Sequence, residues 1–298
     1  MKRILLTLLL IGLLPLNQFA QTPTEEPQQY IMKVHLKGEQ PILVPVDKID
    51  SVQFIVSDSV LTPAPLPLEY VLEYNVDSIG TALVTTHATD VSGYFTFEDA
   101  VAKFSNITIA GNEYHLPSTA EWCAIIPALQ YNDKLCAKFD KSDETFMDVS
   151  EKVVVQGDTI ISNNDYRLGV NKVTYGLRFK GTQMLSAWRY EYTKVDDCQV
   201  LKITARPVAS DLSIEKVADP LFWESDTDAD VIRYFPASGY KMADDGNVLY
   251  GGSDGSFWTA TTKSDKNAWG MYFYYEEAHL FDLSPRSFLR SVRLFLGK

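Results

Sequence analysis

The chain has 298 residues, of which 46% are hydrophobic and 22% are charged, a composition that is typical of a globular protein and excludes a disordered one. This length allows one large domain or two small ones. The 39 acidic residues outnumber the 27 basic ones, so the formal net charge is −12, which argues against nucleic acid or an anionic membrane surface as a partner.

The first twenty residues are typical of a secretory signal peptide. Two basic residues precede an apolar run at 4–14, and Ala20 offers a small side chain for cleavage. Pro15 interrupts this run before it reaches the ~20 apolar residues that a membrane-spanning helix needs. We therefore expect residues 1–20 to be removed from an exported protein that is extracellular, on the cell surface or periplasmic, with no transmembrane segment in the mature chain.

A short β module and a spacer precede the main domain. Residues 31–36 show strand periodicity, which predicts a β-hairpin within residues 21–56 that turns near Gly38. Three prolines in residues 57–68 indicate an extended linker. The main domain is then expected over residues 69–298.

Local signals predict short helices in the main domain. One is expected over residues 98–104. Another begins at Ser118, because Ser118 and Glu121 fit a capping box, in which a hydroxyl and a carboxylate satisfy the free backbone donors of a helix start. This helix carries Trp122 towards a core. A further helix is expected over residues 213–217.

Strands are expected where apolar and polar residues alternate, as they do on a half-buried antiparallel sheet. The alternating segments are residues 153–155, 173–179, 188–192 and 200–205. From Tyr234 to Arg293, short aromatic runs are separated by turns rich in Gly, Asp and Asn, which predicts a compact β unit.

The three cysteines, Cys123, Cys136 and Cys198, cannot all pair within one chain. An exported protein allows either one disulfide with a spare thiol or three buried thiols, and their spacing leaves both arrangements open. No Cys or Cys/His spacing suggests zinc.

Alternating carboxylates form the best candidate metal site. Asp226, Asp228 and Asp230 offer the hard oxygen ligands that calcium prefers. An EF-hand loop would require Gly after the third acid, whereas Val231 follows here. The alternative is an acidic surface loop. Calcium is thus a candidate ligand, and no other cofactor is expected.

Aromatic rings are the candidate ligand contacts. Trp258, Trp269, Tyr272 and Tyr274 could stack on sugar rings. Alternate residues of a strand face opposite ways, so some of these rings are expected to be exposed. The alternative is that they fill the core of the domain, as aromatic side chains commonly do.

The sequence offers no candidate catalytic residue. The four histidines are scattered, and no G-x-S-x-G or other hydrolase phrase is present. His115 is expected to pack at a helix entry, and Arg290 and Arg293 are expected to pair with acidic side chains at the closing strand. Enzyme activity is therefore not expected.

Several phrases resemble a known family. The phrase H-L-P-S-x-x-E-W at residues 115–122 resembles R-L-P-T/S-x-x-E-W of the formylglycine-generating (sulfatase-modifying) superfamily. A form of this phrase that is closer to the one in this chain occurs in the Fibrobacter succinogenes major paralogous domains of secreted Bacteroidetes and Fibrobacteres proteins. F-P-A-S-G-Y at 235–240, F-W-T-A at 257–260 and R-S-V-R at 290–293 resemble the end of that domain. The resemblance implies an α+β, C-type-lectin-like fold with antiparallel strands, two helices and long loops.

The same resemblance implies a non-catalytic relative. The active sulfatase-modifying enzymes use cysteines near the C-terminus. In this chain Leu294 follows R-S-V-R, and no cysteine lies beyond Cys198. The reactive group of the family's oxidative chemistry is therefore missing from its expected place.

These observations predict an exported, non-catalytic binding or adhesion protein that contacts a glycan or a protein on a cell surface. One alternative is a fimbria-associated or envelope-assembly component that docks through residues 30–54. The other is a divergent enzyme of the sulfatase-modifying superfamily, in which one of the three cysteines takes over the redox role.

Overall fold

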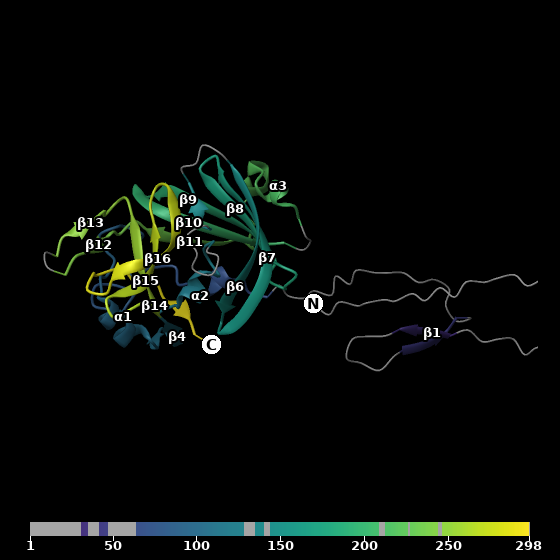
Figure 1. The fold of residues 1–298 in the computed structure, drawn as a ribbon, viewed down its shortest axis with the longest axis horizontal. Helices are drawn as coiled ribbons and strands as arrows, with labels where there is room; N and C mark the ends of the chain where they lie inside the picture. Colours follow the sequence, from purple (N-terminus) through teal and green to yellow (C-terminus); the bar gives the residue numbers. More distant parts are fainter. Residues whose placement is uncertain are drawn as a thin grey trace, which may run out of the picture. The chain divides into compact units, whose positions relative to one another are not determined.

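The computed structural model describes residues 31–34, 42–46, 64–127, 135–139, 144–208, 212–225, 227–243 and 246–297. The chain forms two compact units, residues 1–61 and 62–298. In the first unit, β1 (Ile31–Val34) pairs antiparallel with β2 (Ile42–Pro45), within the predicted hairpin segment (Figure 1). The predicted signal peptide and the predicted hairpin turn lie outside the described residues.

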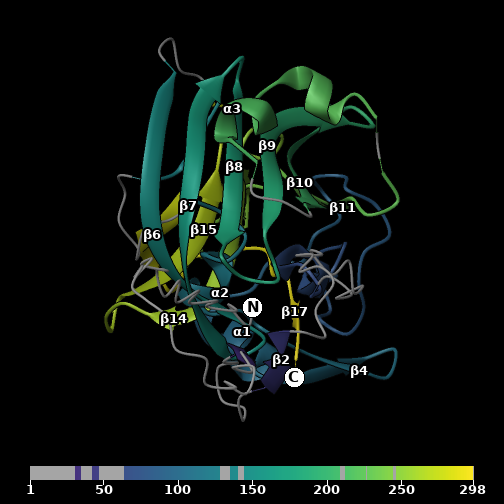
Figure 2. The ribbon, with the colours of Figure 1, turned by 90° about the vertical axis from the view of Figure 1, so that its right-hand side faces the viewer.

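The larger sheet of the second unit is an antiparallel meander of six strands (Figure 2). Its strands are β6 (Thr145–Val155), β7 (Asp158–Val170), β8 (Val173–Lys180), β9 (Ser186–Val195), β10 (Cys198–Pro207) and β11 (Val231–Pro236). Neighbours in the sheet are also neighbours in the sequence. The strands predicted at 153–155, 173–179, 188–192 and 200–205 lie in β6, β8, β9 and β10 and are confirmed.

Two-residue turns with positive φ join strands of this meander. Asn171 and Lys172, between β7 and β8, have φ of 50° and 67°. Asp196 and Asp197, between β9 and β10, have φ of 48° and 64°. Positive φ at both turn positions is typical of type I′ hairpins, whose twist matches that of the flanking strands. Asn and Asp adopt this conformation more readily than most residues, so the sequence supports the turns locally.

A four-stranded sheet shares a core with the meander. It consists of β14 (Gly255–Thr262), β15 (Asn267–Phe273), β16 (Glu277–Pro285) and β5 (Ala137–Lys138), in that order and all antiparallel. Leu201 and Phe235 of the meander lie in one buried cluster with Phe257 and Phe273 of this sheet. The ring of Trp122 joins them, 5.7 Å from Phe235 and 6.1 Å from Phe257. The predicted antiparallel strands are confirmed, and antiparallel sheets, with few helices, make up most of the regular secondary structure of the described residues.

Short α-helices occupy the three predicted positions. They are α1 (Phe97–Phe104), α2 (Thr119–Trp122) and α3 (Ile214–Val217). The capping box of α2 is confirmed: the Glu121 backbone N–H donates to Ser118 Oγ over 3.3 Å, and the Ser118 N–H donates to the Glu121 carboxylate over 2.8 Å. The side chains of α3 cover part of the meander at β8, on the face opposite the shared core.

Small elements complete the second unit. β3 (Ile107–Ile109), β4 (Asn112–His115) and β17 (Phe295–Leu296) form one sheet, β12 (Tyr240–Lys241) pairs with β13 (Val248–Leu249), and η2 (Pro67–Tyr70) and η3 (Pro220–Trp223) are 3₁₀ turns. Phe95 forms an isolated bridge with Arg290, and Lys241 forms one with Leu289. These bridges bring distant segments beside the four-stranded sheet.

The segment from Leu289 to Leu294 connects many parts of the second unit. Its backbone groups form hydrogen bonds with those of Leu72, Val76, Phe95, Lys241, Ser256 and Trp258. This segment thus holds together parts of the chain that are far apart in the sequence.

Arg293 anchors this segment with a fully buried side chain. Its guanidinium donates to Asn75 Oδ1 (2.7 Å) and to the carbonyls of Leu72 (2.8 Å), Glu73 (2.6 Å) and Tyr234 (2.8 Å). Burial lowers the pKa of Arg293 to about 9. The prediction that Arg293 pairs with an acidic side chain is wrong, because its partners are an amide and three backbone carbonyls.

Replacing Arg293 tests this anchor. We expect Arg293→Met to lower the free energy of unfolding by about 3 kcal/mol or more, because four buried acceptors lose a charged donor. Urea denaturation of the purified chain measures the change. The control is Arg286→Met, which removes a partly exposed ion pair with Glu98 and should change stability by less than ~1 kcal/mol. Equal effects of the two variants would contradict the assignment.

Candidate functional site

A cavity of about 360 Å³ lies beside the four-stranded sheet. It is lined by Tyr240, Tyr272, Tyr274, His279, Pro285, Phe288 and Arg290. Its volume falls within the ~300–1,000 Å³ typical of ligand sites, and its lining combines aromatic rings with a few polar groups, as such sites do. This cavity is the candidate binding site.

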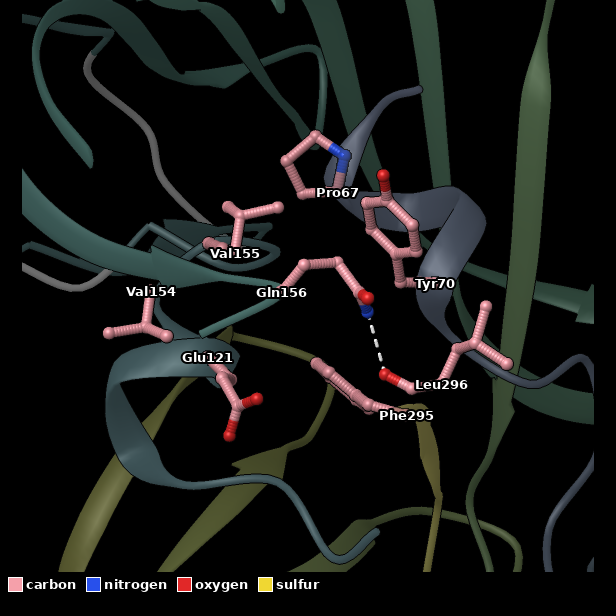
Figure 3. A pocket seen from close by; sticks show the side chains of 9 residues that line it. Pro67, Tyr70, Glu121, Val154, Val155, Gln156, Phe295 and Leu296 are labelled. Atoms are coloured by element: carbon pink, nitrogen blue, oxygen red, sulfur yellow. Dashed lines mark hydrogen bonds between the residues drawn. The ribbon is translucent and has the colours of Figure 1, made fainter. Parts of the chain in front are cut away.

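Figure 3 shows a second pocket, lined in part by Pro67, Tyr70 and Gln156, which is too small to bind a ligand. Its volume is about 10 Å³, which admits roughly one water molecule. Gln156 closes it by donating from Nε2 to the carbonyl of Leu296 over 2.6 Å. The carboxylate of Glu121, which also lines this pocket, lies 2.7 Å from His115 Nε2. Burial favours the neutral form of Glu121, but the hydrogen bonds from His115 and Ser118 outweigh it and lower the pKa.

One wall of the larger cavity comes from β15, whose alternation separates core from cavity. Met271 and Phe273 are fully buried in the core that the two sheets share. Tyr272 projects from the other face, because alternate residues of a strand point in opposite directions, and Tyr274, directly after β15, also lines the cavity; both rings are half-buried. Their ring centroids are 5.9 Å apart. The strand and the residue that follows it therefore present two neighbouring phenol rings to the cavity.

A second wall comes from two segments far apart from β15 in the sequence. Tyr240 in β12 stacks on Phe288, with ring centroids 5.4 Å apart and an interplanar angle of 10°. The backbone of Lys241 is bonded to that of Leu289 in both directions, which fixes this stack in place. The cavity thus lies among aromatic rings from three segments of the chain.

Asp254 holds Tyr272 in position. The Tyr272 hydroxyl donates to Asp254 Oδ2, and the Ser253 hydroxyl donates to Asp254 Oδ1 over 2.7 Å. Burial raises the pKa of Tyr272 well above its usual value, and the hydrogen bond to the carboxylate raises it further. Tyr272 is therefore a neutral phenol at physiological pH, with its hydroxyl hydrogen committed to Asp254.

His279 forms the polar edge of the cavity. Its ring centroid lies 5.8 Å from that of Tyr272, and its Nδ1 lies 3.2 Å from Glu277 Oε1. Glu277 also pairs with Lys138 of β5. The carboxylate of Glu277 thus lies between the His279 ring and the Lys138 ammonium.

Arg290 closes the inner end of the cavity. Its side chain is 4% exposed, and its guanidinium carbon lies 5.0 Å from the Trp258 ring centroid and 5.7 Å from that of Tyr240. Burial lowers the pKa of Arg290 to about 10. The prediction that Arg290 pairs with an acidic side chain is wrong, since it makes no ion pair with any described residue.

Two of the four aromatic residues that were predicted to contact a ligand lie together at the cavity. Tyr272 and Tyr274 line the cavity. Trp258 is fully buried, and its Nε1 donates to the carbonyl of Phe95 over 2.7 Å, so this ring belongs to the core. Trp269 is 9% exposed, belongs to the core between the sheets and has the Lys263 ammonium 5.1 Å from its ring centroid. Neither tryptophan lines the cavity.

The structure describes two of the three candidate calcium ligands, Asp228 and Asp230. Asp226 lies outside the described residues, and Asp228 is exposed. Asp230 accepts hydrogen bonds from Arg206 Nε and Nη2, each 2.7 Å long, and from the Thr227 hydroxyl. Burial alone would raise the pKa of Asp230, but these bonds lower it. Across the described ranges, no group of three or more His, Cys, Asp and Glu side chains is placed to hold a metal ion.

All three cysteines lie within the described residues, and no disulfide joins any of them. Cys123 and Cys136 are buried, and Cys198 is half-buried. Of the two arrangements that the spacing left open, the structure contains the one without a bridge.

The chain matches the family described as Domain of unknown function (DUF8237) over residues 63–295, and it belongs to that family. No curated protein matches the chain, and no solved structure does. The matched range includes both sheets and every residue that lines the cavity. In the described parts of the chain, no helix has the length and apolar character to cross a membrane.

Gly270 offers a test of the packing around Arg290. A Cβ at this position would lie 2.9 Å from Arg290 Nη1 and 2.9 Å from the Phe257 carbonyl oxygen. We expect Gly270→Ala to lower the free energy of unfolding by about 1–3 kcal/mol, because the strand must shift to relieve this overlap. The control is Gly251→Ala, whose Cβ would meet only the Val248 side chain. Thermal unfolding compares the two, and an unchanged Gly270→Ala midpoint would contradict the packing.

Proposed function

We propose that the chain is an exported, non-catalytic binding or adhesion protein that takes a saccharide ring on a cell surface into its tyrosine-lined cavity. The observation that carries this proposal is the lining itself. Three tyrosines and a phenylalanine provide flat apolar faces, while phenol, imidazole and guanidinium groups lie at their edges. A sugar ring has the same two characters, because its C–H faces pack on aromatic rings and its hydroxyls need hydrogen bonds.

The rigid mounting of the lining supports a binding role. Tyr272 is held by its hydrogen bond to Asp254, and Tyr240 by its stack on Phe288. Side chains that are already ordered lose little conformational entropy when a ligand binds, so a modest number of contacts can give useful affinity.

A C-type-lectin-like arrangement is part of the same proposal. The phrases that resemble the major paralogous domain converge in space, although they are far apart in the sequence. Trp122 of the first phrase packs on Phe235 and Phe257 of the later ones. The Ser291 N–H in the last phrase donates to the carbonyl of Ser256 over 3.1 Å. Antiparallel strands with short helices are also the elements that this fold requires.

The non-catalytic part of the proposal has two supports. No cysteine follows Cys198 in the sequence, so the resemblance brings no reactive thiol to the end of the domain. Of the residues that line the cavity, none carries the aliphatic hydroxyl or thiol that covalent catalysis commonly uses as a nucleophile.

A glycan array with the purified chain, with and without calcium, tests the proposal, followed by titration calorimetry with the selected saccharide. We expect Tyr274→Ala and Tyr240→Ala to weaken binding about tenfold or more, since each removes a wall of the cavity. The matched control is Phe146→Ala, which removes a 54% exposed ring from β6 and should leave the affinity unchanged.

Binding that is equal in all three variants would place the site elsewhere. The absence of selective saccharide binding would overturn the proposal. Calcium dependence of the binding would assign a role to the segment that contains Asp226, Asp228 and Asp230.

A further inference from the structure

Arg290 differs from the other buried arginines in the described chain. Arg178, Arg206 and Arg293 each donate at least three hydrogen bonds to carbonyls or polar side chains. Arg290 is equally buried, but its Nε and Nη1 atoms have no hydrogen-bond partner among the described residues. Its donors are therefore unused by the fold.

An unused buried guanidinium is unfavourable for the fold alone. Burial removes the hydration of the cation, and hydrogen bonds or an opposite charge normally replace it. The rings of Trp258 and Tyr240 compensate only in part, because a cation–π contact is weaker than a paired, hydrogen-bonded charge. The pKa of Arg290, about 10, keeps the group charged at neutral pH. A positive charge thus lies at the cavity without a counterion from the described chain.

The guanidinium lies close against β15, where only a glycine leaves room for it. Gly270 lies two residues before Tyr272 on β15 and therefore on the same face of the sheet. The position that a Cβ would take at Gly270 is 2.9 Å from Arg290 Nη1 and 3.4 Å from Ser284 Oγ. Ser284 Oγ is likewise buried without a partner among the described residues. Two polar groups without a hydrogen-bond partner among the described residues therefore both lie near Gly270.

We infer that the saccharide bound in this cavity is acidic, with its ring on the tyrosines and its oxyanion group on the Arg290 guanidinium. This inference rests on the proposed function and specifies its ligand. Arginine suits the task because its planar donors match an oxyanion and several of its N–H groups can bind at once. The oxyanion is a carboxylate, as in a uronic acid, or a sulfate ester on a neutral sugar.

Although the chain is acidic overall, such a site can still select a ligand whose negative charge lies next to Arg290. The formal net charge of −12 repels anions at long range, but this repulsion is screened beyond about 8–10 Å at physiological ionic strength. Arg290 acts at contact distance and in a partly desolvated place, where screening is weak. The charge of Arg290 therefore increases the affinity only of a ligand whose ring contacts place an oxyanion beside the guanidinium.

The first test uses the unmodified chain and matched ligands. Titration calorimetry compares a galacturonic acid trisaccharide with the galactose trisaccharide of the same linkage, and a sulfated galactose trisaccharide separates the two oxyanions. We expect an acidic ligand to bind about tenfold or more tightly than the neutral one. Equal affinities for acidic and neutral ligands would overturn the inference and leave the proposed function intact. No binding of any saccharide would overturn both.

The second test compares Arg290→Met with Arg293→Met, two buried arginines in one segment. Arg290→Met should keep the unfolding midpoint of the unmodified chain or raise it, since no described residue loses a hydrogen bond. It should also remove the preference for the acidic ligand while keeping affinity for the neutral one. Arg293→Met should lower the midpoint. Arg290→Lys, which keeps the charge but loses the planar donors, should give an intermediate preference.

A structural role for Arg290 would give a different result. If Arg290→Met lowers the midpoint as much as Arg293→Met does, and the acidic preference survives in Arg290→Lys and Arg290→Met, the inference is wrong. If Arg290→Met does not fold, the ligand comparison in the unmodified chain and in Arg290→Lys decides.

Discussion

The fold depends on the hydrogen bonds made by the segment from Leu289 to Leu294. Arg293 ties this segment to the carbonyls of Leu72 and Glu73, more than two hundred residues earlier. The same segment carries Arg290, so the anchor that closes the domain also fixes a charge at the cavity. The buried guanidinium of Arg293, with its four hydrogen bonds, has little freedom to move and therefore fixes the backbone of this segment. The fold thus determines the backbone position of Arg290, which does not need a ligand.

Side chains on β15 and directly after it alternate between the core, where they stabilise the fold, and the cavity, where they can contact a ligand. Met271 and Phe273 fill the core between the sheets, while Tyr272 and Tyr274 line the cavity. Any distortion of the strand would disturb both, so the core keeps the phenol rings in place. Sites built on strands are held more precisely than sites on loops for this reason.

Local features of the fold were predictable from the sequence, and contacts between distant segments were not. The capping box at Ser118 and the alternation in β8 to β10 are signals within a few residues, and both were confirmed. β7 was missed because polar residues interrupt its alternation, among them Asn164, whose buried side chain bonds to Glu151 and to the backbone of Phe179. Propensity cannot anticipate a polar residue that tertiary partners satisfy.

The candidate site was predictable only in part, for the same reason. Tyr272 and Tyr274 could be selected from strand alternation, but Tyr240 and Phe288 reach the cavity through a pairing that no local pattern encodes. Arg290 and Arg293 belong to the same four-residue phrase, and the sequence predicted the same role for both, an ion pair with an acidic side chain. Their roles differ because four acceptors surround Arg293, whereas Arg290 lies between aromatic rings and the cavity.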